Sequence, residues 1–381
     1  MNKKLLSIVQ TIRFKEIFFI LLIFFISRLV TWFLGYYSFK LLEPINSSRY
    51  VWNYVTDKKI DIWAVWDSGY YLNIADEGYS SKISTYRETL NQANYAFFPL
   101  YPLLIHISTF VLHSKVLAGI IISNMSLLAA SFILFYLVKQ DYDSKVAQYS
   151  LFYLYAFPTA FIFTSVYSEA LFLALSLISF YFGKNNKYFL AGIFGFFAAL
   201  TRNVGIFLLI PIIFFYIKHK TDYWNKLTHL IQIALIPTGT LLYALYVRSL
   251  TGEMLSIINI QSAWGRRFGS PIKYIFDGLE SNLYQHRFTS IVVLLTLFIL
   301  LMCFRYLKPA YSSYALILFL LPLFTGLTSM PRYILVIFPI YIMLGLIAKR
   351  NLNLANLLLF VMAITQGMML VFWTSGLDLL M

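Results

Sequence analysis

The sequence is short of charged residues and of cysteine. Only 12% of its 381 residues are Asp, Glu, Lys or Arg, whereas 60% are hydrophobic. A water-soluble domain carries about twice that share of charge, so a soluble domain with a large core is excluded and a chain with many membrane spans is expected. The one cysteine, Cys303, lies in an apolar run. No disulfide can therefore form within the chain.

Acidic residues are scarcer than basic ones. The chain has 16 Asp and Glu against 30 Lys and Arg, which gives a formal net charge of +14. In a chain this apolar, such an excess is typical of cytosolic loops that face anionic lipid headgroups. We therefore expect membrane lipids as partners and no nucleic acid.

Apolar runs between polar breaks predict an all-α polytopic membrane protein with about eleven transmembrane helices in a single domain, 1–381. A span needs roughly 20 apolar residues, and shorter runs are tolerated inside a bundle. The first run has no small-residue cleavage site after it and is too long for a signal peptide. The runs cover 16–38, 116–138, 147–164, 169–183, 187–202, 204–217, 228–248, 289–306, 313–327, 333–348 and 354–374.

Two long segments between the spans are expected as outer loops, about 40–115 and about 249–288. The first loop ends in the apolar stretch 97–113, which opens with two prolines, Pro99 and Pro102. A short, proline-led segment favours a re-entrant or interfacial helix over a full crossing.

The distribution of cations predicts the orientation. With the N-terminus in the cytosol, the inner segments carry a net charge of +11 and the longer outer segments only +2. Cytosolic loops of membrane proteins have this excess of Lys and Arg. The polar residues at the span ends then gather on the outer face, which favours an enzyme over a transporter with a midplane site. No internal repeat is visible.

The first outer loop contains the stretch VWDSGYYLNIADEGY, residues 65–79. Its apolar residues follow a helical period, Asp67 stands at an N-cap position and Gly78 at a helix stop. Asp67 can thus be a cap, or a general base with Trp66 and Tyr70 offering flat faces to a sugar. The acids at the far end of the helix are expected to be solvated.

This stretch resembles the first outer loop of the PIG-V-like mannosyltransferases, a family of the GT-C class of membrane glycosyltransferases. The similarity rests on Trp66-Asp67, on Ile74-Ala75 with Gly78-Tyr79, and on the later Phe-Phe-Pro at 97–99 with Pro102. Looser matches run over most of the chain in order: TRNVG at 201–205, SMPRYILVIFP at 329–339 and FWTSG at 372–376.

The resemblance implies a GT-C bundle and an inverting transfer of mannose from a polyprenyl or dolichyl phosphate to a hydroxyl of a glycan or glycolipid acceptor. It makes Asp67 the candidate base. Such a reaction needs a base and cations, so no cofactor and no metal are expected. His106 and His113 lie seven residues apart on one apolar face and are interpreted as core or interfacial residues.

Arginines at the outer ends of spans are candidates for the donor phosphate. Arg202 can contact a phosphate or only snorkel to the interface. Arg332 can pair with the donor phosphate and Tyr333 with its headgroup, or both can be interfacial anchors. Arg266 and Arg267 in the second outer loop can capture the donor or bind lipid headgroups.

Two further charged residues lie inside or beside spans. Glu169 is expected in the first turn of a helix, where the dipole favours a carboxylate. It is a candidate to hydrogen-bond the acceptor sugar or to orient Arg202. Arg28 lies half-way along the first span and needs a partner or a wet cavity.

The sequence is thus compatible with three functions. The first is the glycosyltransferase. The second is a flippase or transporter of polyprenyl-linked glycans, and the third is a scaffold subunit for a catalytic partner. A small membrane subunit is an optional partner of the enzyme. The composition favours a bacterial plasma membrane, with the endoplasmic reticulum as the alternative.

Overall fold

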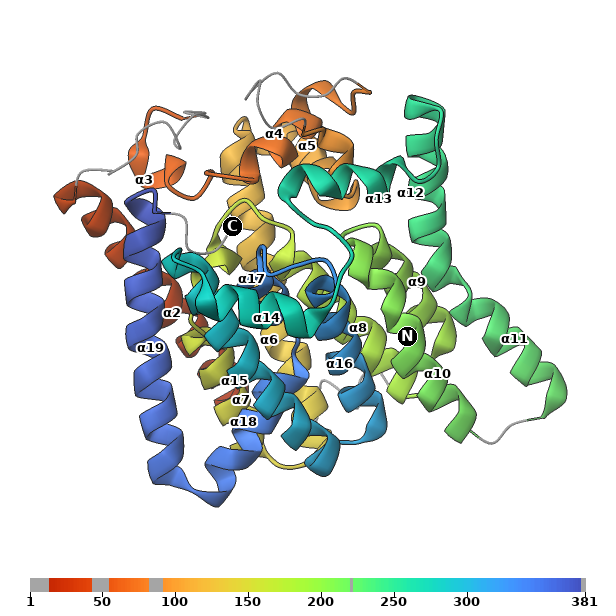
Figure 1. Ribbon diagram of the computed structural model, residues 1–381. Helices are drawn as coiled ribbons and strands as arrows, with labels where there is room; N and C mark the ends of the chain where they lie inside the picture. The colour runs from red at the N-terminus through yellow and green to blue at the C-terminus, as the bar shows by residue number, and fades with distance from the viewer. Residues whose placement is uncertain (1–13, 43–54, 82–91, 220–221, 378–381) are drawn as a thin grey trace.

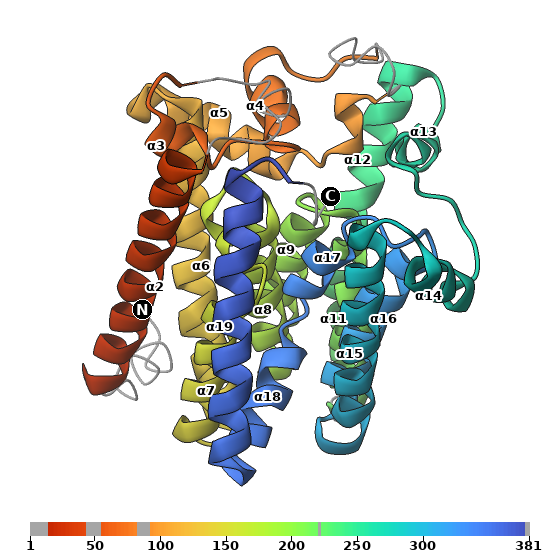
Figure 2. The same ribbon diagram turned by 60° about the vertical axis from the view of Figure 1, so that its left-hand side comes forward.

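The computed structural model describes residues 14–42, 55–81, 92–219 and 222–377, and every regular element within them is a helix (Figure 1). Long helices run side by side, and short helices gather at one end of them (Figure 2). The longest single helices are α2 (Phe14–Leu41), α6 (Lys115–Asp141), α15 (Tyr284–Tyr306) and α19 (Leu352–Thr374).

Five helical stretches within the described residues have the length and apolar composition of a membrane span. They are the four long helices above and Tyr223–Thr251, which consists of α11 (Tyr223–Ile233) and α12 (Leu235–Thr251). Each of the eleven predicted runs contains helix, but the other six hold only shorter helices. The number eleven therefore stays a prediction.

The shorter helices of the bundle follow the remaining apolar runs. They are α7 (Ser144–Ala156), η4 (Ala160–Thr164), α8 (Glu169–Lys184), α9 (Tyr188–Ala199), η5 (Asn203–Leu208), α10 (Leu209–Lys218), α16 (Pro309–Leu323), α17 (Met330–Leu335) and α18 (Pro339–Arg350). The two predicted outer loops contain α3 (Lys58–Asp61), α4 (Ser68–Glu77), η3 (Asn94–Ala96), α5 (Leu100–Leu112), α13 (Ser256–Asn259), η6 (Ile260–Trp264) and α14 (Pro271–Glu280).

Two runs predicted as single spans each contain two helices with a break between them. The run 147–164 is interrupted after α7 because Phe157 precedes a proline and is extended, with φ −58° and ψ 138°. The run 333–348 is interrupted between α17 and α18, where Pro339 opens the second helix. Unpaired backbone groups are costly in a membrane. Gln366 satisfies two of them by donating to the carbonyls of Tyr155 (2.9 Å) and Phe157 (3.0 Å).

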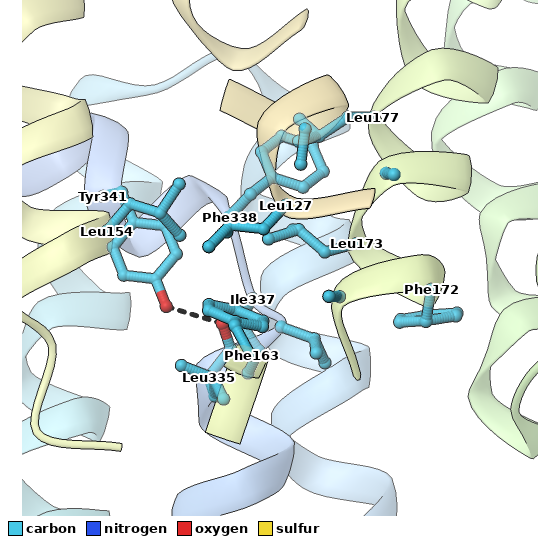
Figure 3. Packing of buried hydrophobic residues seen from close by; sticks show 14 of the residues in the cluster. Leu127, Leu154, Phe163, Phe172, Leu173, Leu177, Leu335, Ile337, Phe338 and Tyr341 are labelled. Carbon is cyan, nitrogen blue, oxygen red and sulfur yellow. Dashed lines mark hydrogen bonds between the residues drawn. The ribbon is translucent and has the colours of Figure 1, made fainter. Parts of the chain in front are cut away.

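The core lies around these two breaks. Figure 3 shows side chains of α6, α7, α8 and α18 meeting there, among them Leu127, Leu154 and Leu173. The hydroxyl of Tyr341 donates to the carbonyl of Leu335 at 2.5 Å and so ties α18 to the end of α17 (Figure 3). The segment that leads into α8 and the whole of α17 are therefore held firmly.

Ion pairs fasten the opposite end of the bundle, which is the predicted inner end. Asp141 is 3% exposed at its side chain and pairs with Lys184 at 2.7 Å and with Lys308 at 2.5 Å. Glu16 pairs with Lys139 at 2.8 Å. The orientation itself stays a prediction.

Candidate active site

The site begins at the N-terminus of α4. This helix ends as predicted, since Gly78 has φ 77° and its N–H donates to the carbonyl of Ile74 at 3.0 Å. The predicted capping by Asp67 was wrong, because its side chain makes no hydrogen bond with the first turn. Trp66 has φ 60°, an unusual value for a side-chain-bearing residue. This turn directs the Asp67 carboxylate away from its own helix.

The carboxylate of Asp67 belongs instead to an alternating chain of four charges. Its Oδ2 lies 2.6 Å from Nη1 of Arg332, and Nη2 of Arg332 lies 3.0 Å from Oε1 of Glu169. The same Glu169 oxygen lies 2.8 Å from Nη1 of Arg202. The four residues come from α4, α17, α8 and the junction of α9 with η5. The folded chain thus unites four separate sequence regions at one point.

Burial makes these pairings necessary. Glu169 is 0%, Arg332 5% and Arg202 8% exposed. An unpaired buried charge costs several kcal/mol, roughly, so such groups persist only with partners. Two acids and two arginines balance in charge. Among the described residues Oε2 of Glu169 has no hydrogen-bond partner, so this carboxylate keeps one acceptor unused.

Aromatic rings and hydroxyls fix the arginines in place. The guanidinium of Arg332 lies 4.5 Å from the centre of the Tyr167 ring. Tyr333 lies between two cations, with Arg202 at 5.3 Å and Arg266 at 4.8 Å from its ring centre. Such cation–π contacts favour a fixed position of the guanidinium.

Tyr71 adds a hydroxyl to the same site. Its phenol forms a 2.8 Å hydrogen bond with the hydroxyl of Ser168, which also accepts from Nη1 of Arg202 at 3.4 Å. Burial, and after it the charge of Glu169, raises the pKa of the Tyr71 phenol above its ordinary value. Tyr71 therefore stays protonated and can donate.

A cavity of about 600 Å³, including its open mouth, lies over the charged chain. It is bounded by α4, η3, η6, η5 and α17. Its lining residues are Asp67, Tyr71, Ala96, Phe97, Phe98, Thr201, Arg202, Asn203, Gln261, Trp264, Arg266, Ser329, Arg332 and Tyr333. Both predicted outer loops contribute to it, as do the spans.

Arg266 supplies a charge that the chain of four does not balance. Its Nη2 donates to the carbonyl of Thr328 at 3.3 Å, and its guanidinium lies against Tyr333. No carboxylate of the described residues pairs with it. The cavity therefore offers a cation without a counter-charge beside the carboxylate of Asp67, an arrangement suited to an anionic group.

The structure brings together most, but not all, of the residues chosen from the sequence. Asp67, Arg202, Arg266, Arg332 and Tyr333 line the cavity. Glu169 lies behind the wall and bridges the arginines.

Besides Glu169, three chosen residues do not line the cavity. Arg267 is exposed and is held by its backbone, whose N–H donates to the carbonyl of Thr325 at 3.0 Å. Trp66 packs near Trp373, with 6.5 Å between ring centres. Tyr70 stacks on Phe97 at 4.7 Å and donates its hydroxyl to Gln92 at 2.5 Å. The aromatic wall of the cavity is formed by Phe97 and Trp264 instead.

Sequence reasoning missed several lining residues. Tyr71 was not chosen from the sequence, and only the fold shows that it borders the site. Gln261 and Trp264 lie in η6, directly before the Arg266 segment. Their proximity to that arginine was the one signal available.

A second, mainly apolar cavity of about 1170 Å³ adjoins the first. It is lined by α4, α5 and α12, including Pro102, Leu103, Leu242 and Tyr246. Pro99 and Leu200 line it, while the next residues, Phe98 and Thr201, line the charged cavity. An apolar groove thus leads directly to the charged site.

Comparison with solved structures assigns the fold of this chain. No protein-family model and no curated protein sequence matches this chain. The crystal structure of ArnT from Cupriavidus metallidurans bound to undecaprenyl phosphate superposes with a TM-score of 0.53 at 13% identity, over 87% of this chain. The apo structure of the same protein gives a TM-score of 0.51 at 13% identity and the same coverage. The fold is of the GT-C type.

The expected GT-C bundle is thereby confirmed as a fold. The chain spans only 60% of the length of ArnT in either state. Among its described residues are five candidate membrane spans, which agrees with the expectation of a multi-pass membrane protein.

Proposed function

We propose that the chain is a membrane glycosyltransferase that moves a hexosyl group, mannose by the sequence resemblance, from a polyprenyl phosphate to a hydroxyl of a glycan or glycolipid acceptor. The observation that carries this proposal is the juxtaposition of the Asp67 carboxylate and the uncompensated Arg266 in one cavity that joins an apolar groove. The fold shared with ArnT, which has been crystallised with undecaprenyl phosphate, supports the same class of donor.

The reaction follows from the charges. An acceptor hydroxyl attacks the anomeric carbon, a new glycosidic C–O bond forms, and the bond from that carbon to the phosphate oxygen breaks. The polyprenyl phosphate leaves with the electron pair, and Asp67 takes the proton of the hydroxyl. Attack opposite the leaving group inverts the anomeric centre. A positioned base contributes about 10²–10⁴-fold to such a rate.

Arg332 connects the base with the donor. Its Nη1 lies 2.6 Å from Oδ2 of Asp67. A donor phosphate that enters beside Arg266 competes for the same guanidinium. Nη1 of Arg332 can donate to the phosphate while Nε and Nη2 keep their hydrogen bonds to Glu169. The base is then released for the acceptor only once the donor is bound.

The apolar groove fits the lipid part of the donor. Its walls on α5 and α12 are mainly apolar and aromatic side chains, with His106 among them, while Asp76 and Glu77 line it at the end of α4. The groove borders the charged cavity at Pro99 and Leu200. A polyprenyl chain gains free energy in proportion to the apolar area removed from water. The phosphate at the end of the chain would then reach Arg266 and Arg332.

The position of the cavity disfavours the two alternative functions. Its lining residues include members of α4 and η6, from the two predicted outer loops. Helices α4 and α13 of these loops lie at one end of the bundle (Figure 2). A transporter would be expected to hold its polar site near the midplane between gates. A scaffold subunit would have no need for Asp67 to line a cavity.

Turnover by the purified protein tests the proposal. The assay supplies polyprenyl-phosphate mannose, with the glucose analogue as comparison, and a panel of mannosyl acceptors. We expect Asp67→Asn to lower kcat by about 10²-fold or more, because the amide keeps the shape and removes the base. The matched control is Asp57→Asn in the same loop, whose exposed side chain caps α3 by accepting from Lys59 at 3.0 Å.

Asparagine also caps helices well, so Asp57→Asn should keep full turnover. Unchanged turnover in Asp67→Asn would remove Asp67 as the base. Transfer of glucose but not mannose would replace the sugar assignment and leave the site intact.

A further inference from the structure

A third cavity borders the charged site at Ser329, whereas the apolar groove borders that site at Pro99 and Leu200. Its volume is about 380 Å³, within the usual range of ligand pockets of about 300–1,000 Å³. It lies between α14, the start of α15 and the loop that leads into α17. Its lining residues are Gly265, Tyr274, Asp277, Gly278, Gln285, His286, Thr289, Gly326, Leu327, Thr328 and Ser329.

This cavity shares a wall with the charged site. Ser329 lines both cavities, and Gly265 lines one where the adjacent Arg266 lines the other. The partition is the 3.3 Å hydrogen bond from Nη2 of Arg266 to the carbonyl of Thr328. A molecule held in the third cavity would therefore extend past this one hydrogen bond toward Asp67.

The walls of the third cavity are well held. Gly278 packs α14 so closely on α15 that an added Cβ would lie 2.1 Å from Oγ of Ser290. The hydroxyl of Tyr274 donates to the carbonyl of Arg267 at 2.5 Å, which fixes the ring at the cavity edge. Gly269 donates to the carbonyl of Phe324 at 2.8 Å and joins the second outer loop to the loop before α17. These contacts hold the segments that line the cavity in fixed positions.

The chemistry of the third cavity differs from that of the charged site. It presents a carboxylate (Asp277), an amide (Gln285), an imidazole (His286) and a hydroxyl (Thr289), with no lining arginine or lysine. No cation of the described residues pairs with Asp277. Mixed donors and acceptors suit vicinal hydroxyls, and Tyr274 adds a flat ring for a sugar face. A phosphate would be repelled by Asp277.

We infer that this cavity binds the saccharide of the acceptor, so that donor lipid and acceptor glycan reach the charged site across different borders. The inference deepens the proposed function and rests on it. It commits to a neutral, hydroxyl-rich ligand, with Asp277 as the residue that recognises it. A lipid headgroup with a phosphate would instead favour the side of Arg266.

Cysteine protection tests the inference without any need for turnover. The native Cys303 is 0% exposed, so an introduced cysteine is the one that a water-soluble thiol reagent labels. Gln285→Cys places the reporter in the cavity. Glu280→Cys is the control, because Glu280 is exposed on the same helix pair and lines none of the three cavities. The probes are disaccharides of mannose, glucose and galactose, and a phospholipid vesicle.

We expect at least one disaccharide to slow the labelling of Gln285→Cys by about tenfold at ten times its Kd, by mass action, with no change for Glu280→Cys. Equal labelling rates with and without every disaccharide that the wild-type protein glycosylates would overturn the inference. Protection by the vesicle alone would also overturn it in favour of a lipid site.

Acceptor kinetics are the second test of the inference. Asp277→Asn should raise the acceptor KM by about tenfold, the loss of roughly one hydrogen bond to a charged group, with the donor KM unchanged. Glu280→Gln should change neither constant. An increase in the donor KM instead would overturn the assignment to the acceptor. A wild-type protein that transfers no sugar from any donor overturns the proposed function, and protection at position 285 still decides whether the cavity binds saccharide.

Discussion

Arg332 and Asp67 are 265 residues apart in the sequence, yet Nη1 of the arginine donates to Oδ2 of the aspartate at 2.6 Å. The arginine is buried at 5% exposure and also holds Glu169 through Nε at 3.1 Å and Nη2 at 3.0 Å. One planar fork therefore joins the candidate base to the rest of the charged chain. The candidate base Asp67 and the candidate phosphate-binding residue Arg332 therefore form a direct ion pair.

We expect both a neutral and a charged replacement of Arg332 to impair the protein, the neutral one in stability and the charged one mainly in activity. Removing one partner of a buried pair costs about 3–5 kcal/mol, so Arg332→Gln should lower the free energy of unfolding in detergent by that order. Arg332→Lys keeps the charge but its single ammonium cannot reach two carboxylates in the same way. We expect Arg332→Lys to fold better than Arg332→Gln and still to lose most of its transfer activity.

Thermal unfolding of both variants, measured beside transfer rates, checks this expectation. A fully active Arg332→Lys protein would show that charge alone matters at this position and that the fork geometry does not.

Glu169 and Arg202 should behave as one energetic unit. Glu169 is fully buried, and its Oε1 holds Nη1 of Arg202 at 2.8 Å. Glu169→Gln leaves Arg202 without its carboxylate, so adding Arg202→Gln should then cost much less than it does alone. The coupling energy between such neighbours is about 0.5–3 kcal/mol. A double-mutant cycle on unfolding free energies measures it.

The control cycle combines Glu169→Gln with Asp141→Asn. Asp141 pairs with Lys184 at the other end of α8, about 24 Å away along sixteen helical residues. Distant sites add their effects, so this cycle should show no coupling. Coupling of equal size in both cycles would mean that the bundle responds as a whole and that the Glu169–Arg202 contact is not special.

The helices of the bundle could largely be predicted from the sequence, because each needs an apolar run. What the runs did not show was where a buried helix stops. The prolines at 158 and 339 lie inside apolar stretches, and a break there is stable only when a distant side chain such as Gln366 satisfies the freed carbonyls. Such partners depend on tertiary structure and cannot be read from local pattern.

The site could be predicted in its parts but not in its connections. Asp67 was found by motif, and Arg202 and Arg332 by their positions at span ends. The capping expected of Asp67 failed because a buried arginine is a stronger partner for a carboxylate than a backbone N–H of its own helix. Trp66 and Tyr70 were chosen for their aromatic rings, whereas the fold turns Tyr71 toward the site.

Arg266 should act on the donor with little effect on stability. It contacts only the carbonyl of Thr328 and the ring of Tyr333, so its loss leaves no carboxylate unpaired. We expect Arg266→Gln to raise the donor KM by about tenfold or more, as for the loss of one charge-assisted hydrogen bond. The acceptor KM should stay unchanged.

The neighbouring Arg267→Gln is the matched control for Arg266→Gln. It removes the same charge from an exposed side chain that does not line the cavity. If both variants raise the donor KM equally, the effect is a general attraction of the second outer loop for anionic lipid, and Arg266 has no direct contact with the phosphate.

Gly205 should be required for the position of Arg202. Its N–H donates to the carbonyl of Arg202 at 2.9 Å, and an added Cβ would lie 2.4 Å from the carbonyl oxygen of Ala198. Because the obstacle is backbone, no side-chain rotation can relieve it. We expect Gly205→Ala to destabilise the protein by about 1–3 kcal/mol and to lower transfer by shifting Arg202 relative to Glu169.

Gly367→Ala is the opposite case and the control. Gly367 lies inside α19 with no atom within 4 Å of an added Cβ. Alanine is favoured over glycine in a helix interior by up to about 1 kcal/mol, so this variant should unfold at a higher temperature with unchanged transfer. Thermal unfolding of both variants in detergent compares them directly. Equal destabilisation by the two substitutions would show that the loss at position 205 does not come from the close approach of η5 to α9.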